Sequence, residues 1–102
     1  MKNRIDLHKE ILNLVGVNVK VYYQPPSSVK ITYPCVIYKL DSDKTKYAND
    51  IKYIKHKRYS LTIVTKDADS ELPDLFDSLT YCKFDRMYMS ENLYHYVYTI
   101  YY

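Results

Sequence analysis

The chain has 102 residues, which is the length of one domain, and its 47% hydrophobic and 26% charged residues are typical of a globular protein, not a disordered one. Fifteen basic and twelve acidic residues leave a net charge of +3, which is too balanced to require a nucleic-acid partner, although it permits a local basic patch. The length predicts a single domain over residues 1–102, the single glycine excludes Gly-rich phosphate loops, and the absence of a long apolar run predicts that the protein stays in the cytoplasm where it is made.

The first predicted element is an amphipathic helix over residues 3–15. Its apolar residues recur at helical spacing and form one stripe. The stripe consists of Leu7, Ile11, Leu14 and Val15, and Ile5 and Leu12 widen it. Asn3 is the expected N-cap, and Gly16, the single glycine, ends the helix.

A strand is predicted next, over residues 17–23. Apolar and polar residues alternate there, so one side, which begins with Val17 and Val19, is expected to be buried. Prolines interrupt the ladder in QPPSS at 24–28 and again in Tyr33-Pro34, because proline has no N–H to donate.

The following strands flank a polar segment. Residues 35–40, CVIYKL, are predicted to form a short strand, and residues 41–50 an exposed loop or a hairpin extension. Residues 51–65 are predicted to form a long antiparallel strand whose second half is core and whose basic first half projects from the body. This projecting arm is either a contact surface or a solvated hairpin tip whose charges discourage edge pairing.

A second helix is predicted over residues 66–79. Its apolar residues again recur at helical spacing, and they are Leu72, Leu75, Phe76 and Leu79. Asp67, Asp69 and Ser70 offer N-capping oxygens, and Pro73 requires the helix to begin close before it.

Two strands joined by a short turn end the sequence. Residues 81–89 alternate, residues 90–92 suit a hairpin turn, and residues 93–102, LYHYVYTIYY, predict a strand inside the sheet. Leu93 and Val97 are expected to meet the core. The tyrosine side is expected to meet a helix, another subunit or a partly wet surface, since tyrosine has an apolar ring and a polar tip.

The predicted order is therefore α-β-β-β-α-β-β. Short turns between neighbouring strands favour a mainly antiparallel sheet with both helices packed on it, which is an α+β fold. The 14 tyrosines predict a tyrosine-rich outer surface that a monomer of this size does not explain.

No set of residues predicts an active site, a metal centre or a cofactor site. The three histidines are far apart in the sequence. Asp67, Asp69 and Glu71 resemble a carboxylate cluster for a divalent ion, but helix capping explains them more simply. Cys35 and Cys82 lie in apolar segments outside CxxC spacing, which predicts two buried, reduced thiols. The sequence thus predicts a protein that is not an enzyme and has no cofactor.

Several segments in the second half of the chain resemble one protein family. They are TKDADSELPD, YCKFDRMYMSENLYHYVYTIYY and the earlier YPCVIY and RYSLTIV, which lie between residues 33 and 102. In this order they resemble small phage and prophage proteins of Gram-positive bacteria that are encoded among head-tail joining and tail genes. The family resemblance implies a tail terminator, also called a tail completion protein, with an α+β fold.

This resemblance also implies partners and a place in the virion. The expected assembly is a hexameric ring that caps the tail tube at the head-tail interface. The major tail tube protein would bind on one side and the head completion or connector protein on the other. DNA would pass through the lumen without sequence-specific binding, and no membrane would be involved.

A ring requires two different contact surfaces on each copy, because one patch meets a different patch on the next subunit. Tyrosine and arginine are common in such contacts. The candidate interface residues, chosen from composition and period, are Tyr47, Tyr53, Lys55, Lys57, Arg58, Asp85, Arg86, Tyr88, Tyr94, Tyr96 and Tyr98.

A small basic RNA-binding domain or toxin-like ribonuclease is the competing hypothesis. Lysines, arginines and tyrosines on a compact domain can grip phosphate and stack on bases. The modest net charge and the acidic KDADSE segment count against it. A third alternative is a sheet module that binds a host regulator.

Overall fold

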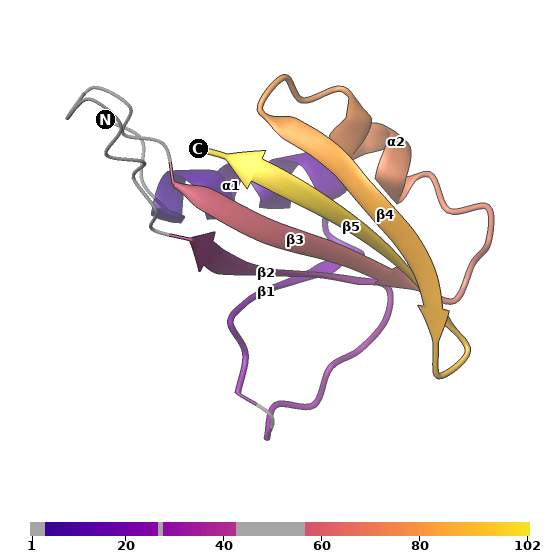
Figure 1. Ribbon diagram of the computed structural model, residues 1–102. Coiled ribbons are helices and arrows are strands. Elements are labelled where there is room, and N and C mark those ends of the chain that lie inside the picture. The colour runs from indigo at the N-terminus through magenta and orange to yellow at the C-terminus, as the bar shows by residue number, and fades with distance from the viewer. Residues whose placement is uncertain (1–3, 27, 43–56) are drawn as a thin grey trace, which may run out of the picture.

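The computed structural model describes residues 4–26, 28–42 and 57–102, and within them it confirms the predicted order of elements (Figure 1). The helices are α1 (Arg4–Val15) and α2 (Leu72–Asp77), and the strands are β1 (Lys20–Tyr23), β2 (Cys35–Ser42), β3 (Arg58–Thr65), β4 (Cys82–Ser90) and β5 (Leu93–Tyr101). The strands form one sheet in the order β1-β2-β3-β5-β4. The fold is α+β, as predicted.

The sheet is antiparallel except at one edge, where β1 pairs with β2 in parallel. The last strand, β5, lies between β3 and β4, so its predicted position inside the sheet is confirmed. A two-residue turn joins β4 to β5, and both of its residues, Glu91 and Asn92, have positive φ angles of 54° and 65°. This turn fits the right-handed twist of a hairpin. In the strand order, β4 is an edge strand of the sheet.

Both helices cover the same face of the sheet (Figure 1). Leu7 and Ile11 of α1 and Phe76 of α2 are buried against residues of β2, β3 and β5. The residues that β5 contributes to this core are Tyr98 and Ile100, not Leu93 and Val97. The tyrosine side of β5 therefore meets the helices, which is one of the three environments predicted for it, and the main core lies on that side.

Leu93 and Val97 point to the opposite face but are also buried. Leu93 belongs to a smaller cluster with Cys35 and Val64, and Tyr22 packs against that cluster. Both faces of β5 therefore bury apolar side chains, as expected for a strand in the middle of a sheet.

Many tyrosines lie in the core, which corrects the expectation of a tyrosine-rich outer surface. Tyr38, Tyr59 and Tyr98 are almost fully buried. The hydroxyl of Tyr38 is 2.6 Å from Nδ1 of His8 and 3.3 Å from a guanidinium nitrogen of Arg4, both on α1. Such polar partners at the rim allow a tyrosine ring to fill the core without leaving its hydroxyl unsatisfied.

The first helix ends as predicted, but its apolar stripe is narrower. Gly16 has a φ of 82° and donates its N–H to the carbonyl of Leu12, a conformation that glycine adopts without a Cβ clash. Ile5 and Leu12, which were expected to widen the stripe, are exposed. Val17 is 94% exposed, and β1 begins only at Lys20, so the predicted strand over 17–23 was too long.

The second helix is also shorter than predicted and begins at Leu72. Asp67 and Ser70 accept the backbone N–H groups of Asp69 and Leu72, so they stabilise turns before the helix. The N-cap residue is Glu71, which makes no side-chain capping hydrogen bond. The helix begins directly before Pro73, as the sequence required.

The carboxylate of Glu10 joins α1 to the far end of the sheet. One of its oxygens accepts a hydrogen bond of 2.7 Å from the hydroxyl of Tyr81, which precedes β4, and the other accepts one from Tyr102, which follows β5. The rings of Tyr81 and Tyr102 also contact each other edge to face at 5.3 Å. This cluster attaches the residue before β4 and the residue after β5 to the first helix.

Replacing Glu10 with glutamine is expected to lower the free energy of unfolding by about 1–3 kcal/mol, since hydrogen bonds to a charged group contribute more than neutral ones and an amide offers one acceptor, not two. Urea unfolding followed by circular dichroism measures the change. Glu71→Gln is the matched control, because the Glu71 side chain is exposed and makes no capping bond. Equal stability of the two variants would contradict a stabilising role for the cluster.

Candidate functional site

The predicted basic arm falls mostly outside the described residues, since Tyr47, Tyr53 and Lys55 belong to the segment between 42 and 57. Lys57 exchanges two backbone hydrogen bonds with Tyr102. Nε of Arg58 lies 3.3 Å from Oδ2 of Asp41, so this arginine forms an ion pair between β3 and β2. Both side chains are more than 40% exposed, and such a pair contributes little to stability.

The three tyrosines predicted as interface residues on β5 differ in burial. Tyr98 is 1% exposed, and its ring packs on Phe76 of α2, so its assignment to an interface is wrong. Tyr96 is partly buried and packs against the main core. Tyr94 is also partly buried, at the hairpin end of the strand.

Asp85, Arg86 and Tyr88, the predicted interface residues on β4, are all exposed. Asp85 and Arg86 form a 2.9 Å ion pair between neighbouring residues of β4. The Arg86 guanidinium lies 5.9 Å from the centre of the Tyr88 ring. Tyr88 in turn stacks on His95 of β5, with ring centres 4.6 Å apart. These side chains form one row across the face of the sheet that the helices leave open.

The other face of β4 carries an apolar stripe that the sequence did not indicate. Phe84, Met87 and Met89 are 48%, 50% and 56% exposed, and we call these three residues the β4 stripe. Their cross-strand neighbours on β5 are Tyr98, Tyr96 and Tyr94. Exposed apolar side chains that gather on one edge strand are unusual on a monomer and mark an interaction surface.

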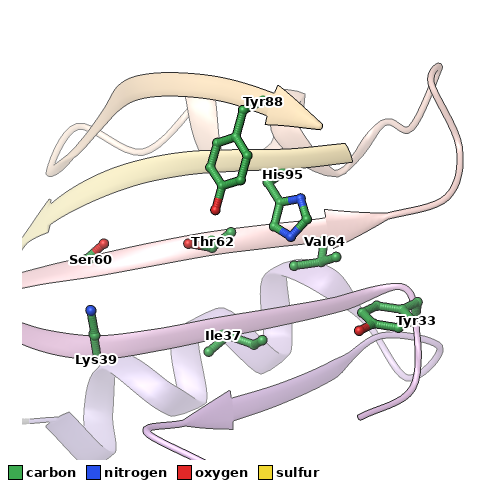
Figure 2. A pocket seen from close by; sticks show the side chains of 8 residues that line it. All are labelled: Tyr33, Ile37, Lys39, Ser60, Thr62, Val64, Tyr88 and His95. Carbon is green, nitrogen blue, oxygen red and sulfur yellow. The ribbon is translucent and has the colours of Figure 1, made fainter. Parts of the chain in front are cut away.

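A shallow hollow lies on the open face of the sheet, beside the Tyr88–His95 stack (Figure 2). Its volume is about 280 Å³. The lining residues come from β2, β3, β4, β5 and the loop before β2, and they are Tyr33, Ile37, Lys39, Ser60, Thr62, Val64, Tyr88 and His95. Figure 2 shows Tyr88 and Tyr33 on opposite sides of it. The lining is mixed: Ile37, Val64 and the two tyrosine rings are apolar, whereas Lys39, Ser60, Thr62 and His95 are polar.

The remaining reactive side chains have structural roles. Within the described ranges, no group of three His, Cys, Asp or Glu residues is arranged to hold a metal ion. Cys35 and Cys82 are free thiols, and burial raises their pKa to about 11 and about 12, so both are protonated at neutral pH. Cys82 is only half-buried, whereas Cys35 is fully buried as predicted. Burial, with the nearby charge of Arg4, lowers the pKa of His8.

Comparisons with family models, with curated proteins and with solved structures found no match to this chain. No helix in the described part of the chain is long and apolar enough to cross a membrane. The contact surfaces on β4 and on the open face of the sheet therefore carry the functional argument.

Proposed function

We propose that this chain is a structural protein of a long-tailed phage, which caps the tail tube and joins the tail to the head connector as a ring of six copies. Its partners are other copies of itself, the major tail tube protein and the head completion or connector protein. It acts at the head-tail interface of the virion and assembles in the host cytoplasm. The proposed ring surrounds the DNA path without reading its sequence.

The observation that carries this proposal is the exposed β4 stripe. Full burial of an apolar side chain contributes roughly 1.5–3 kcal/mol, and Phe84, Met87 and Met89 are about half exposed, so about half of that stabilisation is not gained by the isolated chain. An assembly protein gains it when it meets its neighbours. The segments that carry the family resemblance, FDRMY and ENLYHYVYTIYY, lie on β4, the turn and β5, and FDRMY contains Phe84 and Met87 of this stripe.

The geometry also offers two different surfaces, as a ring requires. The β4 stripe lies on the helix-covered side of the sheet, whereas the hollow beside Tyr88 lies on the open side. A half-exposed apolar stripe and a shallow hollow on opposite faces of the sheet suit a head-to-tail contact. The open face also has Lys39 and Arg86 near the hollow, which suit an acidic rim on a partner.

The proposal is tested with tail tubes assembled from the major tail tube protein of a long-tailed phage of a Gram-positive host. We expect the purified chain to bind tube ends, visible by negative-stain imaging, and to stop further tube growth. Met87→Asp is expected to reduce end binding by at least about tenfold, because it places an unpaired charge in a contact that excludes water.

Val17→Asp is the matched control, since Val17 is also an exposed apolar residue but precedes β1, which lies at the opposite edge of the sheet from β4. It is expected to bind tube ends like the unmodified chain. Absence of end binding, together with salt-sensitive binding of single-stranded RNA, would contradict the proposal and support an RNA-binding domain.

A further inference from the structure

The edge strand β4 is interrupted by a β-bulge at its centre. Phe84 pairs with Tyr98 and Arg86 pairs with Val97, so Asp85 is an extra residue on β4. A bulge of this kind shifts the alternation of a strand by one position. The two halves of β4 therefore have opposite alternation, and the backbone shows which residues point outward.

Hydrogen bonds at both ends fix the backbone direction of β4. The N–H of Tyr101 donates to the carbonyl of Tyr81, so the backbone N–H and C=O of residue 81 point towards β5. By alternation, the backbone groups of Phe84 point away from β5, towards the free edge of the sheet. At the other end, the two-residue turn closes on the pair Ser90–Leu93, so the backbone groups of Ser90 point towards β5 and those of Met87 and Met89 point towards the free edge. The backbone groups of both bulge residues, Asp85 and Arg86, then point towards β5.

The side chains of β4 follow the same symmetry about the midpoint between Asp85 and Arg86. One position beyond this pair of residues, Phe84 and Met87 lie on the helix-covered side, opposite Tyr98 and Tyr96 of β5. Two positions beyond it, Lys83 and Tyr88 lie on the open side, opposite Thr99 and His95. Read in either direction from its centre, β4 thus has the same sequence of faces and of outward backbone groups.

We propose that β4 pairs antiparallel with β4 of a second copy of this chain, around a two-fold axis that passes between Asp85 and Arg86. In this register, Phe84 lies opposite Met87 of the second copy, and the two form a hydrogen-bonded pair on each side of the axis. Asp85 lies opposite Arg86 of the second copy, and Lys83 lies opposite Tyr88. The two sheets join into one, with the helices of both copies on the same side.

Charge complementarity selects this partner. Around the axis, each carboxylate of Asp85 meets a guanidinium of Arg86 and no two like charges on β4 face each other. Each Lys83 ammonium meets the ring of Tyr88, which is a favourable cation–aromatic contact. A register shifted by one residue would place Arg86 opposite Arg86, which is unfavourable.

Charged residues and bulges on an edge strand commonly oppose pairing with other strands. The charged residues of β4 oppose pairing with a strand that is only basic or only acidic, because such a strand would place a like charge opposite Arg86 or Asp85. With a second copy of β4, the same charges are paired, and the β4 stripe of each copy extends that of the other. The bulge and the charges thus admit one partner and disfavour others, which is the usual basis of pairing specificity.

This dimer goes beyond the proposed function and does not depend on it. A two-fold contact closes after two copies, whereas a cap with different partners on its two sides requires head-to-tail contacts. The proposed dimer is therefore a form of the free chain, distinct from the ring contact. Its test uses the purified chain alone, so its failure is distinct from a failure to bind tail tubes.

The test compares two charge reversals, Asp85→Arg and Arg86→Asp, alone and mixed. Sedimentation equilibrium of the unmodified chain is expected to show dimers. Each variant alone brings like charges together across the axis and is expected to weaken the dimer by at least about tenfold. An equimolar mixture restores opposite charges at both positions, so heterodimers are expected to form with nearly the original affinity.

Two further measurements complete the design. Circular dichroism checks that both variants remain folded, which is expected because both side chains are exposed. Asp85→Cys mixed with Arg86→Cys is expected to form an intermolecular disulfide faster than either variant alone, because these positions face each other only between copies. A monomeric or ring-forming unmodified chain, dimeric single variants, or a mixture that stays monomeric would each overturn the proposal.

Discussion

Replacing Tyr98 with alanine is expected to lower the free energy of unfolding by about 3–5 kcal/mol, the range for removal of a large aromatic side chain from a core. The ring contacts Phe76 of α2 and Phe84 of β4. Its hydroxyl lies 3.0 Å from the carbonyl oxygen of Pro73 and 3.0 Å from Oδ1 of Asp77, both on α2. The variant loses these contacts together, so α2 is held less firmly on the sheet.

Two variants separate the contributions of the ring and of the hydroxyl. Tyr98→Phe keeps the ring and is expected to cost about 1–2 kcal/mol, because the hydrogen bonds of the hydroxyl to Pro73 and Asp77 are lost. Tyr101→Ala, on the same strand, removes a tyrosine that is 47% exposed and is expected to cost clearly less than Tyr98→Ala. Urea unfolding at neutral pH measures all three. Equal losses for Tyr98→Ala and Tyr101→Ala would contradict the assignment of Tyr98 to the core.

Unfolding is expected to become easier as the pH rises above about 9, where unfolded thiols begin to ionise. Burial raises the pKa of Cys35 to about 11, and it raises the pKa of Cys82, beside Asp77, to about 12. Burial and the hydrogen bond to Asp77 also raise the pKa of Tyr98, and burial with Glu10 raises that of Tyr81. The folded chain therefore keeps protons that the unfolded chain releases.

The sign of the effect follows from these raised pKa values. The stabilisation is fully present below the unfolded pKa and is lost as the pH rises towards the folded pKa. For the fully buried Cys35, the loss is about 2–3 kcal/mol between pH 9 and pH 11, at 1.36 kcal/mol per pKa unit. The exposed part of Cys82 makes its contribution smaller than the shift alone indicates.

Urea unfolding at a series of pH values from 7 to 11 measures this dependence. Cys35→Ala is the matched control, because it removes one of the titrating groups while it leaves the tyrosines in place. The variant is expected to be less stable at pH 7 and to lose less stability between pH 9 and pH 11. A stability that stays constant up to pH 11 would contradict the protonated state of these buried groups.

The sequence predicted elements where local signals agree. Alternation and β-branched residues identified the strand that begins at Cys35, and turn residues identified the β4–β5 hairpin. Gly16 marked the end of α1 because only glycine adopts its backbone angle without strain. The second helix was overextended, since Asp67 and Ser70 accept N–H groups two residues on and favour turns over helix.

The faces of the strands could not be assigned in the same way. In β5, Val97 and Tyr98 are both buried, so periodicity alone does not say which one meets the helices. The β4 residues alternate like those of a buried strand, although the edge position leaves them exposed. The bulge at Asp85 has no signal in the sequence, because it results from the register that β5 imposes. Strand order decides these features, and strand order is set by the whole chain.

The position of β5 between β3 and β4 also sets the order in which the chain folds. The strands β2 and β3 follow each other along the chain and also pair in the sheet. The pairing of β3 with β5 forms only when the later β4–β5 hairpin docks on β3. Contacts between distant parts of a chain form slowly, because the intervening segment loses conformational entropy before they stabilise anything. Docking of the hairpin on β3 is therefore expected to limit the folding rate. Until it occurs, a growing chain on the ribosome leaves β3 unpaired on the side where β5 will bind, and Leu61 and Ile63 are not yet paired with Tyr98 and Tyr96.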